Sequence, residues 1–130
     1  MYVVGLDACK YGWCAIGLYA GQRIWGCYED LSELINTYTN LQRILIDIPI
    51  GLTSENFTRT IDAEARTYLQ NRKSSIFSPP CREAIFVDNY KDALQINRRI
   101  CGKGISIQAY NISRKIREID EWIDVKPASI

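Results

Sequence analysis

The sequence predicts an α/β fold with a mixed β-sheet, and three observations support this prediction. Short β-branched and aromatic stretches follow one another at hairpin spacing near the N-terminus, as in an antiparallel meander. A helical period follows and leads into the most apolar run of the chain, residues 44–52. A strand that follows a crossover helix runs parallel to its sheet neighbour, here most simply the first strand.

Length and composition predict one domain over residues 1–130. The chain is 47% hydrophobic and 24% charged, which is typical of soluble globular proteins. No apolar run approaches the roughly 20 residues that span a bilayer, and no secretory signal is visible. We therefore expect a cytoplasmic protein without a membrane partner.

The histidine and cysteine content restricts the chemistry. The sequence contains no histidine, which excludes Ser-His-Asp and Cys-His catalysis and every histidine-based metal site. The five cysteines form no C-x-x-C pair, so we expect thiols in a reducing compartment rather than disulfides or a zinc site. A metal would then be held by oxygen ligands, which favours Mg²⁺ or Mn²⁺.

Charge is unevenly distributed, although the net charge is only +1. Residues 1–58 carry a net charge of −3, and the remainder carries +4. No acid lies between Asp92 and Glu118, a segment that contains several Arg and Lys residues. This basic segment fits either a phosphate-facing surface or a solvated helix face.

The expected elements of the first half are short. Strands are predicted at 2–7, 13–19, 23–28 and 43–48, with a helix between the last two. Its apolar stripe is Leu31, Leu34, Ile35 and Tyr38. Asp30 and Glu33 form a capping-box pattern at its start.

Helices dominate the second half. One is predicted over about 55–72, capped by Thr53 or Ser54, and a polar loop follows at 73–82. Its expected core stripe is Ile61, Ala65, Tyr68 and Leu69. Two further helices are predicted, one capped by Asn89 and ended by Gly102 and Gly104, the other capped by Ser106.

Two predicted strands end in an aspartate. Residues 44–52 form a strand that we expect to be buried on both faces, with Asp47 at the point where it emerges. Asp47 fits either a functional site at the carboxyl end of a parallel strand or a turn that caps the next segment. Asp7 ends the first strand, so parallel pairing brings the two carboxylates together. A divalent cation would relieve their repulsion, as in two-metal phosphoryl transfer.

The chain resembles the family of predicted ribonuclease-H-like nucleases known as domain of unknown function 429. The resemblance covers nearly the whole chain and implies a ribonuclease-H-like fold in which Asp7 and Asp47 bind the metal. Asp62 is a further candidate acid, although an ion pair with Arg66 in the same helix is an equally good interpretation. The matching residues are Gly5-Leu6-Asp7, Gly12-Trp13, Ile46 to Leu52, Asp62, Ala65-Arg66, Arg72, Ser74 to Phe77, Pro79, Arg82, Gly104 to Gln108, Lys115-Ile116 and Glu118 to Asp120.

The same resemblance implies phosphate-binding residues and shows one departure. The candidates for phosphate contacts, each of which also fits a plain surface role, are Arg59, Arg66, Arg72, Arg82, Gln108 and Lys115. Relatives run past the equivalent of Asp120 into a further strand that carries acids, so we expect that strand and one catalytic carboxylate to be missing. Glu118, Asp120 or Asp124 are possible substitutes, and a homo-oligomer formed through the exposed sheet edge is another way to complete the fold.

Three functions are compatible with these features. The first is a Mg²⁺- or Mn²⁺-dependent nuclease that cleaves RNA or DNA. The second is a non-catalytic binding or assembly module on the same scaffold. Phosphoryl transfer from ATP ranks third, because actin-like kinases clamp the nucleotide between two such domains and this chain has one, without the Gly-rich loop.

Overall fold

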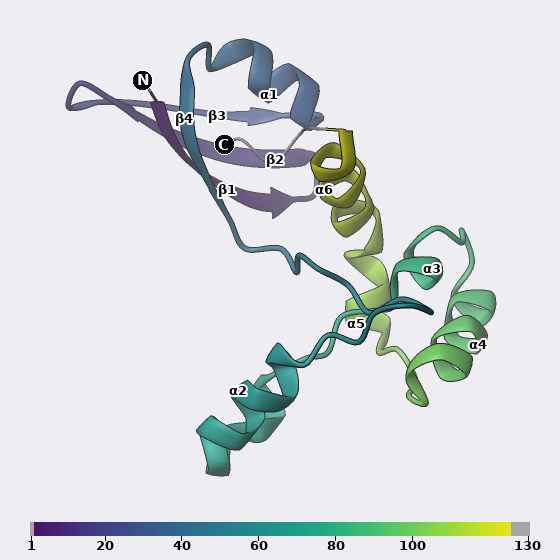
Figure 1. Ribbon diagram of the computed structural model, residues 1–130. Coiled ribbons are helices and arrows are strands. Elements are labelled where there is room, and N and C mark those ends of the chain that lie inside the picture. The colour runs from purple at the N-terminus through teal and green to yellow at the C-terminus, as the bar shows by residue number, and fades with distance from the viewer. Residues whose placement is uncertain (1, 126–130) are drawn as a thin grey trace. The chain divides into compact units, whose positions relative to one another are not determined.

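The computed structural model describes residues 2–125, which form two compact units. The first unit runs to Ile48 and contains a sheet and one helix, and the second spans Pro49–Asp124 and is helical (Figure 1). Within the described residues, we find no helix with the length and apolarity that a membrane span requires.

The first unit is a four-stranded mixed sheet in the order β3-β2-β1-β4. Its elements are β1 (Tyr2–Cys9), β2 (Gly12–Tyr19), β3 (Gln22–Tyr28), α1 (Leu31–Thr37) and β4 (Leu41–Ile46). The β1–β2 and β2–β3 pairs are antiparallel, and β4 pairs with β1 in parallel. The predicted α/β class, with a meander followed by a helix and a parallel strand, is confirmed.

One face of this sheet, the inner face, forms the core of the first unit. Val4, Leu6 and Trp13 are buried there, and Leu34 and Tyr38 are buried with them. A Cβ atom at Gly17 would overlap the ring of Tyr38, so only glycine lets this ring lie against β2. Tight packing of this kind fixes α1 and the chain that enters β4.

Local signals place α1 as predicted. The Asp30 carboxylate accepts a hydrogen bond from the Glu33 amide at 2.9 Å, and the Glu33 carboxylate accepts one from the Glu29 amide at 2.8 Å. These bonds satisfy amide groups that have no partner inside the helix. The start of α1 is therefore encoded within five consecutive residues.

The predicted burial of β4 on both faces is wrong. β4 is the edge strand of the described sheet, and Leu45 is 57% exposed. Ile44 and Ile46 pair with Val4 and Leu6, so only one side of β4 faces the core. A short apolar run cannot by itself distinguish a central strand from an edge strand whose outer face is also apolar.

The second unit consists of short helices and two longer ones, α4 and α6. They are α2 (Ile61–Leu69), the 3₁₀ helix η1 (Gln70–Ser75), α3 (Arg82–Ile85), α4 (Tyr90–Cys101), α5 (Ile107–Asn111) and α6 (Ser113–Val125). Its core contains Cys81, Ala84, Ala93, Ile105 and Ala109. The buried Asn97 side chain joins the segments around it, because it accepts from the Cys81 amide at 2.7 Å and donates to the Lys103 carbonyl at 2.9 Å.

Two of the three predicted helices in this unit need correction. α2 begins at Ile61 rather than near residue 55, because Thr53 uses its hydroxyl to accept from the Arg59 amide instead of capping a helix. Ile61, Tyr68 and Leu69 of the expected core stripe are exposed. The last predicted helix is divided into α5 and α6 at Ile112, whereas the caps at Asn89 and Ser106 are confirmed.

Candidate functional site

The two predicted metal ligands lie near the carboxyl ends of β1 and β4, although β1 runs on to Cys9 and does not end at Asp7 as predicted. Leu6 of β1 pairs with Ile46 of β4, and Asp7 and Asp47 are the next residue along each chain. Because the strands are parallel, the two aspartates leave the sheet at the same end. Both residues are exposed, so solvent and a dissolved cation reach this end of the sheet.

No third carboxylate joins this pair within the part of the chain that the structure describes. In that part of the chain, one group brings three metal-ligating side chains close together, and it contains only cysteines. Asp62, the predicted further acid, belongs to the second unit. The first unit alone therefore offers Asp7 and Asp47 as a two-carboxylate site.

Asp62 forms an ion pair with a different arginine from the one predicted. Arg59 Nε lies 2.9 Å from Asp62 Oδ2, and Arg59 Nη2 lies 3.2 Å from Oδ1, which makes the pair bidentate. Arg59 also donates to the backbone carbonyls of Ile50 and Gly51. The expected Asp62–Arg66 pair is wrong. Both oxygens of the Asp62 carboxylate accept from Arg59, which lies just before α2.

Arg66 supports the loop that follows η1. Its Nη2 donates to the Ile76 carbonyl at 2.7 Å and to Ser78 Oγ at 3.1 Å. Arg59, Asp62 and Arg66 together line a pocket of about 390 Å³ within the second unit. The structure thus brings together three of the predicted site residues, with Lys103 and Ser106 on the same lining. Such a polar, cationic lining suits an anionic group.

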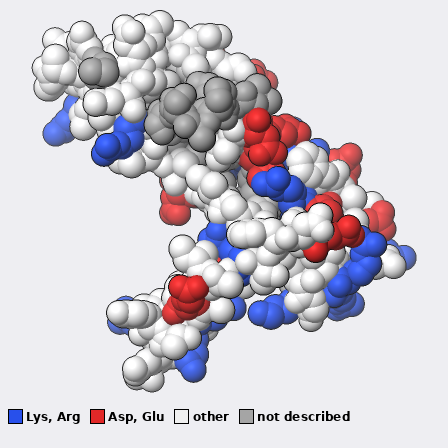
Figure 2. Space-filling view, in the orientation of Figure 1, with Lys and Arg blue, Asp and Glu red and all other residues white. Residues whose placement is uncertain are grey.

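The other predicted phosphate contacts lie apart from this pocket lining. Arg82 pairs with Asp120 at 3.0 Å and with Asp124 at 3.6 Å, and Lys115 pairs with Glu118 at 3.1 Å. Arg72 and Gln108 are exposed, on η1 and α5 respectively. On the face drawn in Figure 2, most Lys and Arg side chains lie over the second unit.

The Asp120 carboxyl lies in a buried position that disfavours its charged form. Burial raises the pKa of the Asp120 carboxyl, while the neighbouring Arg82 guanidinium lowers it and Asp124 raises it further. The acids at 118, 120 and 124, which the sequence offered as substitute ligands, are thus partly engaged by cations: Asp120 and Asp124 by Arg82, and Glu118 by Lys115.

Comparison with known proteins identifies the family. A family model described as protein of unknown function (DUF429) matches residues 5–129. The chain belongs to the DUF429 family. The DUF429 match includes both Asp7 and Asp47 and spans both compact units. No curated protein and no solved structure matches the chain.

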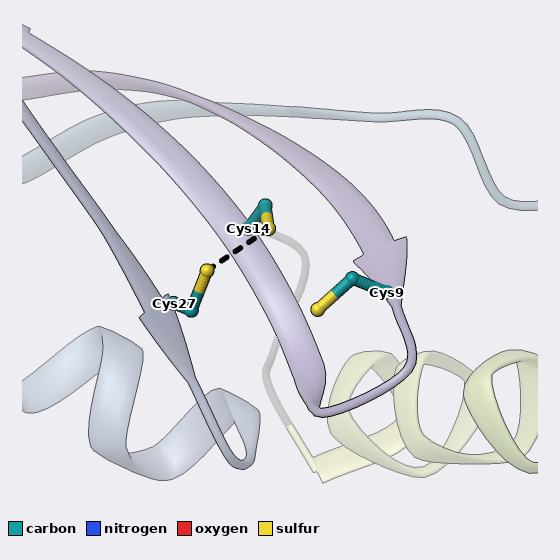
Figure 3. Close-up of side chains that lie close together, drawn as sticks. All are labelled: Cys9, Cys14 and Cys27. Atoms are coloured by element: carbon teal, nitrogen blue, oxygen red, sulfur yellow. Dashed lines mark hydrogen bonds between the residues drawn. The ribbon is translucent and has the colours of Figure 1, made fainter.

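A thiol cluster that was not predicted from the sequence lies on the sheet of this DUF429 protein. Cys9, Cys14 and Cys27 point toward one another on neighbouring strands, and the Sγ atoms of Cys14 and Cys27 lie 3.1 Å apart (Figure 3). Hydrogen bonding to Cys27, and then to Cys9, raises the pKa of the Cys14 thiol to about 12. The missed signal was the hairpin: a turn at residues 20 and 21 places Cys14 opposite Cys27.

Proposed function

We propose that this protein is a divalent-metal-dependent nuclease that hydrolyses phosphodiester bonds in RNA or DNA. The observation that carries the proposal is the parallel register of β1 and β4, in which Leu6 pairs with Ile46, the residues directly before Asp7 and Asp47. The strand order also supports a ribonuclease-H-like fold, with Asp7 two residues before the end of β1 and Asp47 directly after β4.

The residues at this end of the sheet fit a hard cation. Asp7 and Asp47 supply carboxylate oxygens, the ligand type that Mg²⁺ and Mn²⁺ prefer, and both are exposed. When bound, such ions activate water and stabilise the leaving oxygen of a phosphodiester. Asp7 and Asp47 would hold such an ion at an end of the sheet that solvent reaches.

The second unit supports an anionic substrate. Arg59 and Arg66 line the pocket of this unit. Hydrogen bonds to backbone carbonyls hold both guanidinium groups in place. We assign Asp62 to this pocket as the partner of Arg59, because both of its oxygens accept from that guanidinium. Pre-organised cations of this kind bind phosphate with little loss of side-chain entropy.

The test is divalent-dependent cleavage by two charge-neutral variants. Labelled single-stranded and duplex RNA and DNA are incubated with Mn²⁺ or Mg²⁺ and with wild-type, Asp7→Asn or Asp47→Asn protein. We expect each variant to lose about 100-fold in rate, because each removes a carboxylate ligand.

Glu64→Gln is the matched control, since Glu64 is an exposed acid on α2 in the other unit. This variant should cleave at the wild-type rate. Cleavage that survives in Asp7→Asn or Asp47→Asn would refute the mechanism, as would a wild-type rate that does not change when the metal is chelated.

A second candidate function is a non-catalytic binding or assembly module. One argument for it is the outer face of the sheet, which exposes Ile16, Leu18, Trp25 and Leu45. The other is that, among the described residues, no third carboxylate clusters with Asp7 and Asp47. This function predicts self-association in sedimentation equilibrium and no Mn²⁺-induced rise in melting temperature. A rise that disappears in Asp47→Asn would count against the module and support the nuclease.

A further inference from the structure

Three cysteines from three neighbouring strands meet on the outer face of the sheet. Cys9 lies at the end of β1, Cys14 near the start of β2 and Cys27 near the end of β3. Their Sγ atoms all lie within 4.8 Å of one another, and Figure 3 shows the side chains converging. Cys14 and Cys27 are exposed and Cys9 is half-buried, so the cluster is accessible to a dissolved ion.

The backbone register explains why the thiols meet. Cys14 pairs directly with Cys27, so their side chains leave the same face of the sheet. Asp7 pairs with Cys14, and Cys9 lies two residues beyond Asp7, which places Cys9 diagonally across from Cys14 on that face. The arrangement therefore follows from strand pairing and does not depend on a flexible loop.

The spacing of the sulfur atoms is close to that of a metal-thiolate site. Zinc–sulfur bonds of ~2.3 Å in tetrahedral geometry place the sulfur atoms ~3.8 Å apart. Here the closest pair is at 3.1 Å and every pair is within 4.8 Å. The spacing required of the sulfur atoms thus falls between these two distances.

We propose that Cys9, Cys14 and Cys27 form a binding site for one thiophilic cation of the Zn²⁺ class. Thiolate sulfur is a soft ligand that selects such ions over Mg²⁺ or Mn²⁺. The chain has no histidine, so the fourth position is left for an oxygen ligand such as water or a carboxylate. Binding forms three metal–sulfur bonds and releases the thiol protons to the solvent.

This site is separate in chemistry from the Asp7 and Asp47 pair. The aspartates offer hard oxygen ligands, whereas the cysteines offer soft sulfur ligands from one face of β1, β2 and β3. The inference therefore goes beyond nuclease activity and is tested by metal binding rather than by cleavage.

The experiment is a titration of the reduced, metal-stripped protein with Cd²⁺ and with Zn²⁺. Sulfur-to-cadmium charge-transfer absorption reports thiolate ligation, native mass spectrometry reports stoichiometry, and thermal melting reports stabilisation by bound ion. We expect one ion per chain and a rise in melting temperature. Each of Cys9→Ser, Cys14→Ser and Cys27→Ser should weaken binding by about tenfold or more.

Cys101→Ser is the matched control. Cys101 is a half-buried thiol of the second unit, next to Cys81, and this variant should bind Cd²⁺ as the wild type does. Because Cys14 and Cys27 are exposed, their serine variants should fold, and circular dichroism verifies this.

Three results would overturn the proposal. One is the absence of charge-transfer absorption in the reduced wild-type protein. Another is absorption that persists in Cys14→Ser or Cys27→Ser, or that is lost in Cys101→Ser, since the ligands would then lie elsewhere. The third is displacement of Cd²⁺ by excess Mg²⁺, which would indicate carboxylate rather than thiolate ligation.

Discussion

At the scale of single residues, Arg82 and Asp120 show how an ion pair opposes the desolvation of a buried carboxylate. Asp120 is 8% exposed, and Arg82 Nη2 lies 3.0 Å from its Oδ1 atom. Burial raises the pKa of Asp120 and Arg82 opposes that rise. The ion pair thus offsets part of the desolvation that the carboxylate undergoes on folding.

We expect Arg82→Met to destabilise the protein more at neutral than at acidic pH. Without the guanidinium the folded-state pKa of Asp120 rises further. The folded protein then keeps a proton that the unfolded chain loses, so stability falls as pH rises from the unfolded value through the folded one. The loss at pH 7 should be about 2 kcal/mol, below the range for fully buried pairs because Arg82 is partly exposed.

Urea unfolding at pH 4 and pH 7 measures this difference. Arg99→Met is the matched control, because Arg99 and Glu55 form an exposed ion pair that contributes little. Equal losses for the two variants, or a loss at Arg82 that does not change with pH, would show that Asp120 is not held in this way.

The Arg82 pair also marks a limit of prediction at this scale. Arg82 and Asp120 are 38 residues apart, so no local spacing reveals the contact. Arg59 and Asp62 lie three residues apart. α2 contains both Asp62 and Arg66, yet the predicted pair does not form, because Arg66 donates to the Ile76 carbonyl and to Ser78. The position of Asp7 and Asp47 at the same end of the sheet was predictable, because parallel pairing follows from local pattern and connectivity.

At the scale of secondary-structure elements, two strand glycines have opposite surroundings. Gly17 lies on the inner face of β2 beneath the Tyr38 ring, whereas a Cβ atom at Gly5 of β1 would meet nothing within 4 Å. Tyr38 is fixed from above by hydrogen bonds of its hydroxyl with Tyr28 and with the Ile24 carbonyl. The ring therefore cannot easily move away from β2.

Gly17→Ala should destabilise the protein by about 1–3 kcal/mol, the usual cost of overpacking, while Gly5→Ala should be neutral or stabilising by up to about 1 kcal/mol. Thermal or urea unfolding of the two variants measures these changes in the free energy of unfolding. A Gly5→Ala variant as unstable as Gly17→Ala would mean that strand glycines matter here for reasons other than packing beneath Tyr38.

Elements with strong local signals were the predictable ones. In α1 and α4 the N-cap side chain accepts from an amide three residues later, so a short stretch of sequence specifies where each helix begins. α2 lacks a side-chain cap, and its apolar residues are exposed. Periodicity alone cannot say whether an apolar stripe is buried, which is why the stripe on α2 was misassigned to the core.

At the scale of the whole molecule, burial is unequally distributed among the helices. None of the residues described in α2 and η1 is buried, whereas α4 places Ala93 and Asn97 in the core of the second unit. Segments with few buried contacts open with low free energy. The sheet, in contrast, buries residues on β1, β2 and β3.

Hydrogen exchange should therefore divide the chain. We expect the amides of residues 61–75 to exchange fast, with a free energy of local opening near zero. The amides of β1 and β2 should exchange only with global unfolding. Peptide-resolved mass spectrometry measures both, with α4 as the helical reference. Protection of α2 equal to that of α4 would show that the exposed stripe on α2 is covered in solution.

The turn between β2 and β3 also sets which side chains share a face. Ala20 and Gly21 both have positive φ, 47° and 80°, and they join Tyr19 to Gln22 without a spare residue. Because side chains alternate along a strand, a slip of one residue here would move Cys27 and Trp25 to the face of Tyr38. Such a slip at this turn would thus separate the thiols without altering any of them.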